Sequence, residues 1–190
     1  RAQIPVTDAA NITQSIVNSV TELVQTSTTA ENMIGNFKET MKIYRQGKEY
    51  YDRLRNVTHL VRDARKVQQS ILLVGELSDI YVTSYDKMLT DDNFSSQELS
   101  AIAAGYNKLL ERGMNSLKDL KEIVNPTDYS MTDKERLDRI DQAHGELTHT
   151  RDLMVYYTRK NISVSYLRSQ RKNDTQRVLD LYGSADEKYW

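Results

Sequence analysis

An apolar stretch from Val67 to Val82 constrains the fold of this chain more than any other feature of its sequence. Side chains in and just beyond it recur at three- and four-residue spacing, at Val67, Ile71, Val74, Ser78, Tyr81, Tyr85 and Met88. This spacing places them on one face of an α-helix, and Leu72, Leu77 and Val82 widen that face. A face this wide is typical of a helix that packs against more than one neighbour. We therefore predict that the stretch forms the central helix of a bundle.

Two later stretches show the same spacing, and each begins at a capping box. The first box is Ser95-Ser96-Gln97-Glu98, and its helix ends before Pro126, because the residue before a proline avoids the helical region. The apolar stripe of this helix comprises Leu99, Ile102, Tyr106, Leu109, Gly113, Leu117, Leu120 and Val124. The second box runs from Thr132 to Glu135, and the stripe behind it comprises Leu137, Ile140, His144, Leu147, Arg151, Met154, Tyr157, Asn161 and Val164. A short final helix contains Val178, Leu181 and Tyr182, and Gly183 stops it.

The pattern before residue 62 is also helical, but its phase is interrupted. We expect residues 1–7 to be an extended lead-in, with Thr7 or Asp8 as the first helix cap. The spacing weakens at residues 26–29 and slips at 54–57, where we favour a kink or a short turn near Arg55-Asn56 over one continuous helix. Because the chain starts at Arg1, we expect either an end left by signal-peptide removal or an arbitrary boundary.

Composition agrees with long helices. The 190 residues include only two prolines and seven glycines, and no segment alternates between apolar and polar residues as a strand does. The predicted fold is a single all-α domain over residues 1–190. It is an elongated antiparallel bundle of three to four long helices, with a short C-terminal helix and an irregular tail at 184–190. The helix from Leu99 to Val124 is expected to pack against the helix from Val67 to Met88 across the turn at Asp91-Asp92.

The sequence favours a protein without catalytic activity. It contains no phosphate-binding loop, nucleophile elbow or zinc-protease motif, and it has no cysteine. His59, His144 and His149 are not spaced as metal ligands, so we expect neither a metal nor a cofactor. Asp91 and Asp92 are interpreted as a solvated turn. No apolar segment of 18 residues exists that could span a membrane.

Two segments carry opposite charge. Residues 159–172 contain Arg159, Lys160, Arg168, Arg171 and Lys172 and no acid, with Tyr156, Tyr157 and Tyr166 in or beside them. Residues 76–98 contain six acids and one lysine. Basic residues interleaved with aromatic rings could follow a nucleic-acid backbone. We favour the other interpretation, that the two segments face each other within the bundle or steer assembly between subunits.

Four stretches of the sequence are distinctive: QIPVTDAANI at 3–12, RDARKVQQ at 62–69, YYTRKNISVSYL at 156–167, and KNDTQR through YGSADE to YW at 172–190. They resemble a family of conjugative-transposon transfer proteins of gut bacteria. The family is the TraI family of those elements, which is unrelated to the relaxase of the same name. The resemblance covers essentially the whole chain, and its C-terminal end is the most specific part. By a more distant analogy, the chain is similar to minor pilin subunits of type IV secretion systems.

The resemblance implies export to the periplasm or cell surface after signal-peptide removal. It implies a structural or adhesive role in the mating apparatus, with other subunits of that apparatus as partners, and it brings no catalytic motif. Self-association is a further option. The alternative function is a nucleic-acid-binding accessory protein of conjugative transfer that uses residues 159–172. The candidate partner-binding residues are Tyr156, Tyr157, Arg159, Lys160, Tyr166, Arg168, Arg171, Tyr189 and Trp190.

The C-terminal tail ends in two large aromatic residues, Tyr189 and Trp190. Exposed rings at a chain end lower solubility unless they dock on a surface. Two outcomes follow from the sequence. The rings fold back onto the last helix as a clasp, or they insert into a partner, because Trp and Tyr are favoured anchors at interfaces.

Overall fold

A computed structural model gives the structure of the chain and describes residues 62–124 and 132–183. The lead-in, the interruptions at 26–29 and 54–57, His59 and the tail with Tyr189 and Trp190 lie outside the described residues. The described part forms four helices: α3 (Arg62–Leu89), α4 (Ser96–Val124), α5 (Asp133–Arg171) and α6 (Thr175–Tyr182). The predicted all-α class is therefore confirmed, and no strand occurs within these two ranges.

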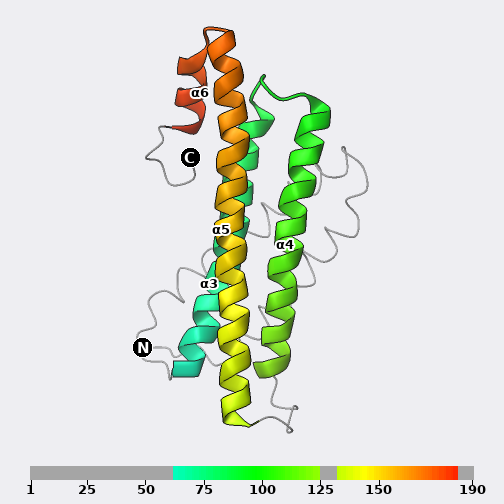
Figure 1. The fold of residues 1–190 in the computed structure, drawn as a ribbon, viewed down its shortest axis with the longest axis vertical. Helices are drawn as coiled ribbons and strands as arrows, with labels where there is room; N and C mark the ends of the chain where they lie inside the picture. Colours follow the sequence, from blue (N-terminus) through cyan, green and yellow to red (C-terminus); the bar gives the residue numbers. More distant parts are fainter. Residues whose placement is uncertain (1–61, 125–131, 184–190) are drawn as a thin grey trace.

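The three long helices run in alternating directions and lie side by side, as Figure 1 shows. α3, α4 and α5 pack against one another in pairs, while the short α6 folds back onto α5 and also contacts α3. The expected contact between α3 and α4 across the turn at Asp91-Asp92 is thus present. α3 touches every other described helix, as a central helix should, but the 39-residue α5 does so too.

The helix ends predicted at Ser95, Thr132 and Gly183, which lie within the described residues, are confirmed. At the start of α4, Ser95 Oγ accepts the Glu98 N–H at 3.2 Å, and Glu98 Oε2 accepts the Ser95 N–H at 2.9 Å. Thr132 and Glu135 make the same reciprocal pair at the start of α5. α6 ends at Gly183, whose φ of 89° lies in the region that glycine adopts without strain.

The core follows the predicted faces of α3 and α4. Val67, Val74, Tyr81, Tyr85 and Met88 are all buried, and so are the flanking Leu77 and Val82. Within α4, the buried predicted positions include Ile102, Tyr106, Gly113 and Leu120. A cluster of tyrosines joins the three long helices: the Tyr106 ring centroid lies 4.9 Å from that of Tyr81 and 5.0 Å from that of Tyr157.

The predicted stripe of α5 is correct in its first half and wrong at its end. Ile140, Leu147 and Met154 are buried, but Val164 is 39% exposed. Beyond Met154 the buried side chains are Thr158, Ile162, Ser165 and Ser169. The hydroxyls of Thr158 and Ser169 donate to a preceding backbone carbonyl, and that of Ser165 donates to Asp91. These three side chains are therefore buried without loss of a hydrogen bond. The predicted stripe, which continued through Asn161 to Val164, therefore follows the wrong face here.

Within residues 62–124 and 132–183, none of the helices combines the length and the apolar character that a membrane span needs.

Candidate functional site

The structure separates the candidate binding residues into two groups. Tyr156, Arg159, Lys160 and Arg171 are exposed on α5. Tyr157, Tyr166 and Arg168 are partly buried in the bundle. The inward group serves the fold, whereas the exposed group is available to a partner.

Two of the inward residues have well-defined structural contacts. The Tyr157 hydroxyl donates to the Ile102 carbonyl oxygen at 3.0 Å, and its ring packs on Tyr106. Arg168 forms a two-pronged ion pair with Glu98, with Nη2 to Oε1 at 2.6 Å and Nη1 to Oε2 at 2.9 Å. Its Nη1 also donates to the Asn93 carbonyl oxygen at 2.7 Å. Two parallel bonds between an arginine and a carboxylate are the strong form of this contact.

This ion pair shifts the acidity of Glu98. The hydrogen bond from Arg168, together with the capping bond from the Ser95 N–H, lowers the pKa of Glu98 to about 2. Lys172 Nζ donates a hydrogen bond to Asn93 Oδ1 at 2.9 Å, a neutral acceptor within the acidic segment. At these two residues, the basic segment meets the acidic segment within the bundle, as the favoured interpretation of the charges expected.

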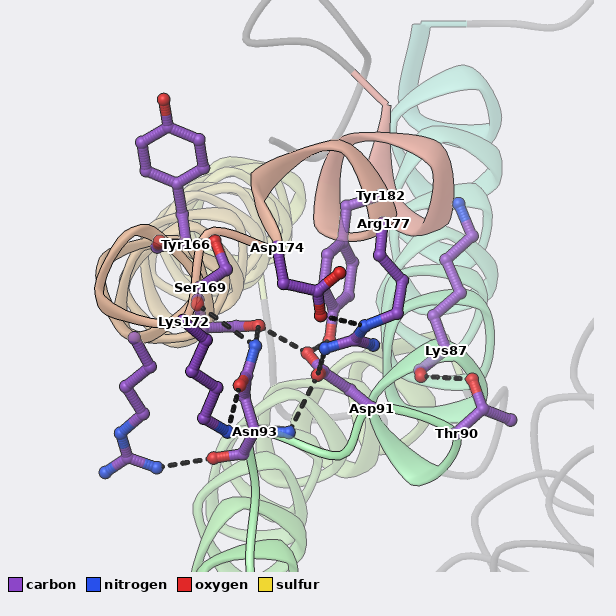
Figure 2. Close-up of polar contacts among 12 residues, drawn as sticks. Lys87, Thr90, Asp91, Asn93, Tyr166, Ser169, Lys172, Asp174, Arg177 and Tyr182 are labelled. Atoms are coloured by element: carbon purple, nitrogen blue, oxygen red, sulfur yellow. Dashed lines mark hydrogen bonds and ion pairs between the residues drawn. The ribbon is translucent and has the colours of Figure 1, made fainter.

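A buried carboxylate lies beside this ion pair, at the end of the bundle where α3 turns into α4 (Figure 2). The Asp91 side chain is buried, and its Oδ2 accepts from the Ser165 hydroxyl at 2.5 Å and from the Tyr182 hydroxyl at 2.6 Å. Its Oδ1 accepts the Asn93 N–H at 3.0 Å and lies 3.5 Å from Arg177 Nη2. We call these five residues the Asp91 cluster.

The Asp91 cluster corrects the expectation of a solvated turn. Asp92 is exposed as predicted, but the residue before it is 3% exposed. The cluster ties the α3–α4 turn to Ser165 on α5 and to Arg177 and Tyr182 on α6. Burial and the hydrogen bond to Asp91 raise the pKa of Tyr182 well above its usual value, so this hydroxyl stays protonated.

The chemistry of the Asp91 cluster is that of a structural joint. Both carboxylate oxygens already have donors, and Arg177 also binds Asp174. A metal needs several acidic or imidazole ligands that converge, and no such group of three occurs in the described part of the chain. His144 lies on the half-buried side of α5, where burial and nearby Lys66 lower its pKa.

The surface available to partners is the side of α5 turned away from the bundle. One row of exposed residues runs along nearly its whole length at three- and four-residue spacing. We call this row the outer face of α5; it comprises Asp138, Gln142, Gly145, His149, Asp152, Tyr156, Lys160, Ser163, Leu167 and Arg171.

Exposed apolar side chains gather on the C-terminal half of this face. Tyr156 and Leu167 are 59% and 60% exposed, and Val164 lies at its edge. These three are the exposed large hydrophobic residues of the described ranges. Lys160 Nζ lies 5.3 Å from the centroid of the Tyr156 ring, which is within the range of a cation–π contact. The sequence analysis identified Tyr156, Lys160 and Arg171 but missed Leu167, whose spacing from Tyr156 and Lys160 was the available signal.

Comparison with known proteins adds one match. A family model described as "Domain of unknown function (DUF4141)" matches residues 1–37, which lie outside the described residues. No curated protein and no solved structure matches the chain. The description of the matched family states no function, so the resemblance to conjugative-transposon transfer proteins stays a prediction.

Proposed function

We propose that this chain is a non-enzymatic structural component of a conjugative type IV secretion apparatus, exported to the periplasm or cell surface. It acts by binding protein subunits through the outer face of α5. The resemblance of residues 3–12, 62–69, 156–167 and 172–190 to transfer proteins of conjugative transposons supports the cellular role. The helical bundle supports a structural one.

The observation that carries the proposal is the exposure of Tyr156 and Leu167 on one helix face. Large apolar side chains grouped on a surface favour contact with another protein. Aromatic residues and arginine are enriched at such contacts, and both occur here, at Tyr156, Arg159 and Arg171. By contrast, the charged groups at the Asp91 cluster are engaged in contacts that hold the fold together.

A complementation experiment tests the proposal. A donor strain with an in-frame deletion of the gene should lose conjugative transfer, and the wild-type chain should restore it. A chain with Tyr156→Glu and Leu167→Glu should fold but should not restore transfer, because the two carboxylates disrupt an apolar contact. The matched control is Lys108→Glu, which changes an exposed residue on α4. Normal transfer by the deletion strain would refute the proposal.

The nucleic-acid alternative has one specific point in its favour: Arg159 and Lys160 are exposed cations beside Tyr156 in the chain, and Arg171 is exposed further along α5. Arg168 and Lys172 are engaged with Glu98 and Asn93, which reduces the charge available to a phosphate backbone. A DNA-binding assay separates the two functions. Affinity that falls steeply with salt and is lost when Arg159 and Arg171 are changed to Gln would favour the alternative.

A further inference from the structure

We propose that the outer face of α5 pairs with the same face of a second copy of this chain, in an antiparallel dimer centred on Tyr156. This inference rests on the proposed function, because it names the first partner of the surface that carries that function. The argument uses only α5, which is 39 residues long and therefore about 58 Å at 1.5 Å per residue.

The outer face is symmetric in its spacing about Tyr156. The exposed positions four, seven and eleven residues after Tyr156 have counterparts at the same three distances before it. When two antiparallel copies of α5 lie side by side with their Tyr156 residues at the same height, each position lies at the height of its counterpart in the other copy. This follows because the rise per residue is constant. The facing pairs are Lys160 with Asp152, Ser163 with His149, and Leu167 with Gly145.

The charges along the face are complementary under this symmetry. Lys160 faces Asp152, and fifteen residues from the centre Arg171 comes to the height of Asp141, an exposed residue beside Gln142 at the edge of the outer face. In a parallel pair every residue would meet its own copy, so that lysine would face lysine and aspartate would face aspartate. Like charges in contact disfavour that arrangement, and a two-fold interface must be complementary to itself. The charge pattern therefore selects the antiparallel pair.

The two acids that take part in these pairs, Asp152 and Asp141, remain accessible although each has a neighbour in its own chain. Asp152 Oδ1 accepts from Arg151 Nε at 2.9 Å, but its side chain is 62% exposed. Asp141 lies 3.5 Å from Lys66 Nζ and is 55% exposed. Carboxylates this open can accept a second cation from another copy.

The shape of the face also fits the antiparallel pair. An added Cβ at Gly145 would meet no atom within 4 Å, so the glycine leaves bare backbone on the helix surface. The facing residue in the second copy is Leu167, which is one of the most exposed apolar side chains of the described part. At the centre, the two Tyr156 rings meet across the axis, and aromatic pairs at 4.5 to 7 Å are favourable.

Sedimentation of the full chain at micromolar concentration tests the charge pairing. The wild-type chain should be a dimer. Lys160→Asp or Asp152→Lys alone should raise the dissociation constant of the dimer by about tenfold or more. In either variant, like charges face each other at both of the symmetry-related contacts between positions 160 and 152. An equimolar mixture of the two variants, or one chain with both changes, should restore the dimer. Circular dichroism of each variant confirms that it is folded.

Cysteine cross-linking tests the direction of pairing, since the chain has no cysteine of its own. A mixture of a Gly145→Cys chain and a Leu167→Cys chain should form a disulfide between the two different chains. Lys108→Cys, on the exposed side of α4, is the control and should not cross-link. A Gly145→Cys chain that cross-links efficiently to itself would overturn the antiparallel geometry.

A monomeric wild-type chain, or a dimer unaffected by Lys160→Asp, would overturn the inference. Either result leaves the proposed function intact if the deletion strain still fails to transfer DNA. Conversely, a dimer with this charge dependence and normal transfer by the deletion strain would refute the proposed function but not the pairing. The two failures are therefore distinguishable.

Discussion

At the scale of the residue, Asp91 shows how one carboxylate joins three helices. It follows α3 in the chain, yet it accepts hydrogen bonds from Ser165 on α5 and Tyr182 on α6. A carboxylate taken out of water is tolerated only when its hydrogen bonds are replaced, and here three donors and Arg177 replace them. The Asp91 cluster therefore helps to fix the positions of α5 and α6 relative to the turn between α3 and α4.

Removal of this carboxylate should destabilise the chain strongly. Asp91→Ala leaves the hydroxyls of Ser165 and Tyr182 without their acceptor and leaves Arg177 without one of its two acids. We expect a loss of about 3–5 kcal/mol in the free energy of unfolding, measured by urea denaturation. The neighbouring exposed Asp92→Ala is the control and should change it by less than about 0.5 kcal/mol. Equal effects of the two substitutions would contradict the structural role of Asp91.

Glu98 provides a prediction of pH dependence. Its pKa is lowered from 4.5 to about 2 in the folded chain, chiefly by Arg168. A carboxyl with a lowered folded pKa stabilises the fold above its unfolded pKa, and this contribution disappears as the pH falls through the folded value. The melting temperature should therefore fall between pH 4.5 and pH 2, and Glu98→Gln should reduce that fall. Glu111→Gln, at an exposed position of α4, should leave this fall in melting temperature unchanged.

At the scale of the element, the close approach of α4 and α5 depends on Gly105. An added Cβ there would come within 2.1 Å of the Tyr157 hydroxyl oxygen and 2.4 Å of its ring. Tyr157 cannot simply rotate away, because its ring packs on Tyr106 and its hydroxyl bonds to Ile102. The absence of a side chain at Gly105 therefore determines how closely α4 and α5 can approach each other at the tyrosine cluster.

Two glycine substitutions should have opposite effects. Gly105→Ala should destabilise the chain by about 1–3 kcal/mol, because Tyr157 must leave its site. Gly145→Ala, at an open position of α5, should stabilise the monomer by about 0.5–1 kcal/mol through helix propensity. Urea denaturation at submicromolar protein concentration, where the chain is monomeric, measures the change in the free energy of unfolding for both variants. A stabilising effect of Gly105→Ala would show that the packing of Tyr157 on α4 is wrong.

Much of this architecture could be predicted from the sequence, because its signals are local. The spacing from Val67 to Met88 and the two capping boxes are each readable within one segment. The buried face of α5 after Met154 was not readable, since Thr158 and Ser165 occupy positions where an apolar residue is expected. The burial of Asp91 depends on Tyr182, 91 residues away, and no local pattern records such a contact.

The candidate surface was predictable in part. Tyr156, Lys160 and Arg171 were identified from the basic composition of their segment, and the structure places them on one exposed face. The same composition included Arg168, which turns inward to Glu98, because composition does not distinguish the two sides of a helix. Leu167 was missed because the candidate residues were chosen for their positive charge or aromatic ring, and leucine has neither.

At the scale of the whole molecule, the described helices form a bundle in which one face of α5 is exposed. Figure 1 shows α5 running along the length of the bundle, with α3 and α4 packed against it and α6 folded back at its end. The Asp91 cluster and the Arg168–Glu98 pair hold the end of α5 in place. The outer face of α5 is therefore held in place relative to the other helices, and assembly through this surface is the step that we propose it performs in the proposed conjugative role.

Transfer frequency in donor cells that carry charge-reversed chains tests this claim most directly. Lys160→Asp and Asp152→Lys should each lower transfer when they replace the wild-type chain at equal protein level. The chain with both changes should recover transfer, because the two charges again face opposite partners across the dimer. Wild-type transfer by both single variants, or no recovery in the double variant, would contradict assembly through the outer face of α5.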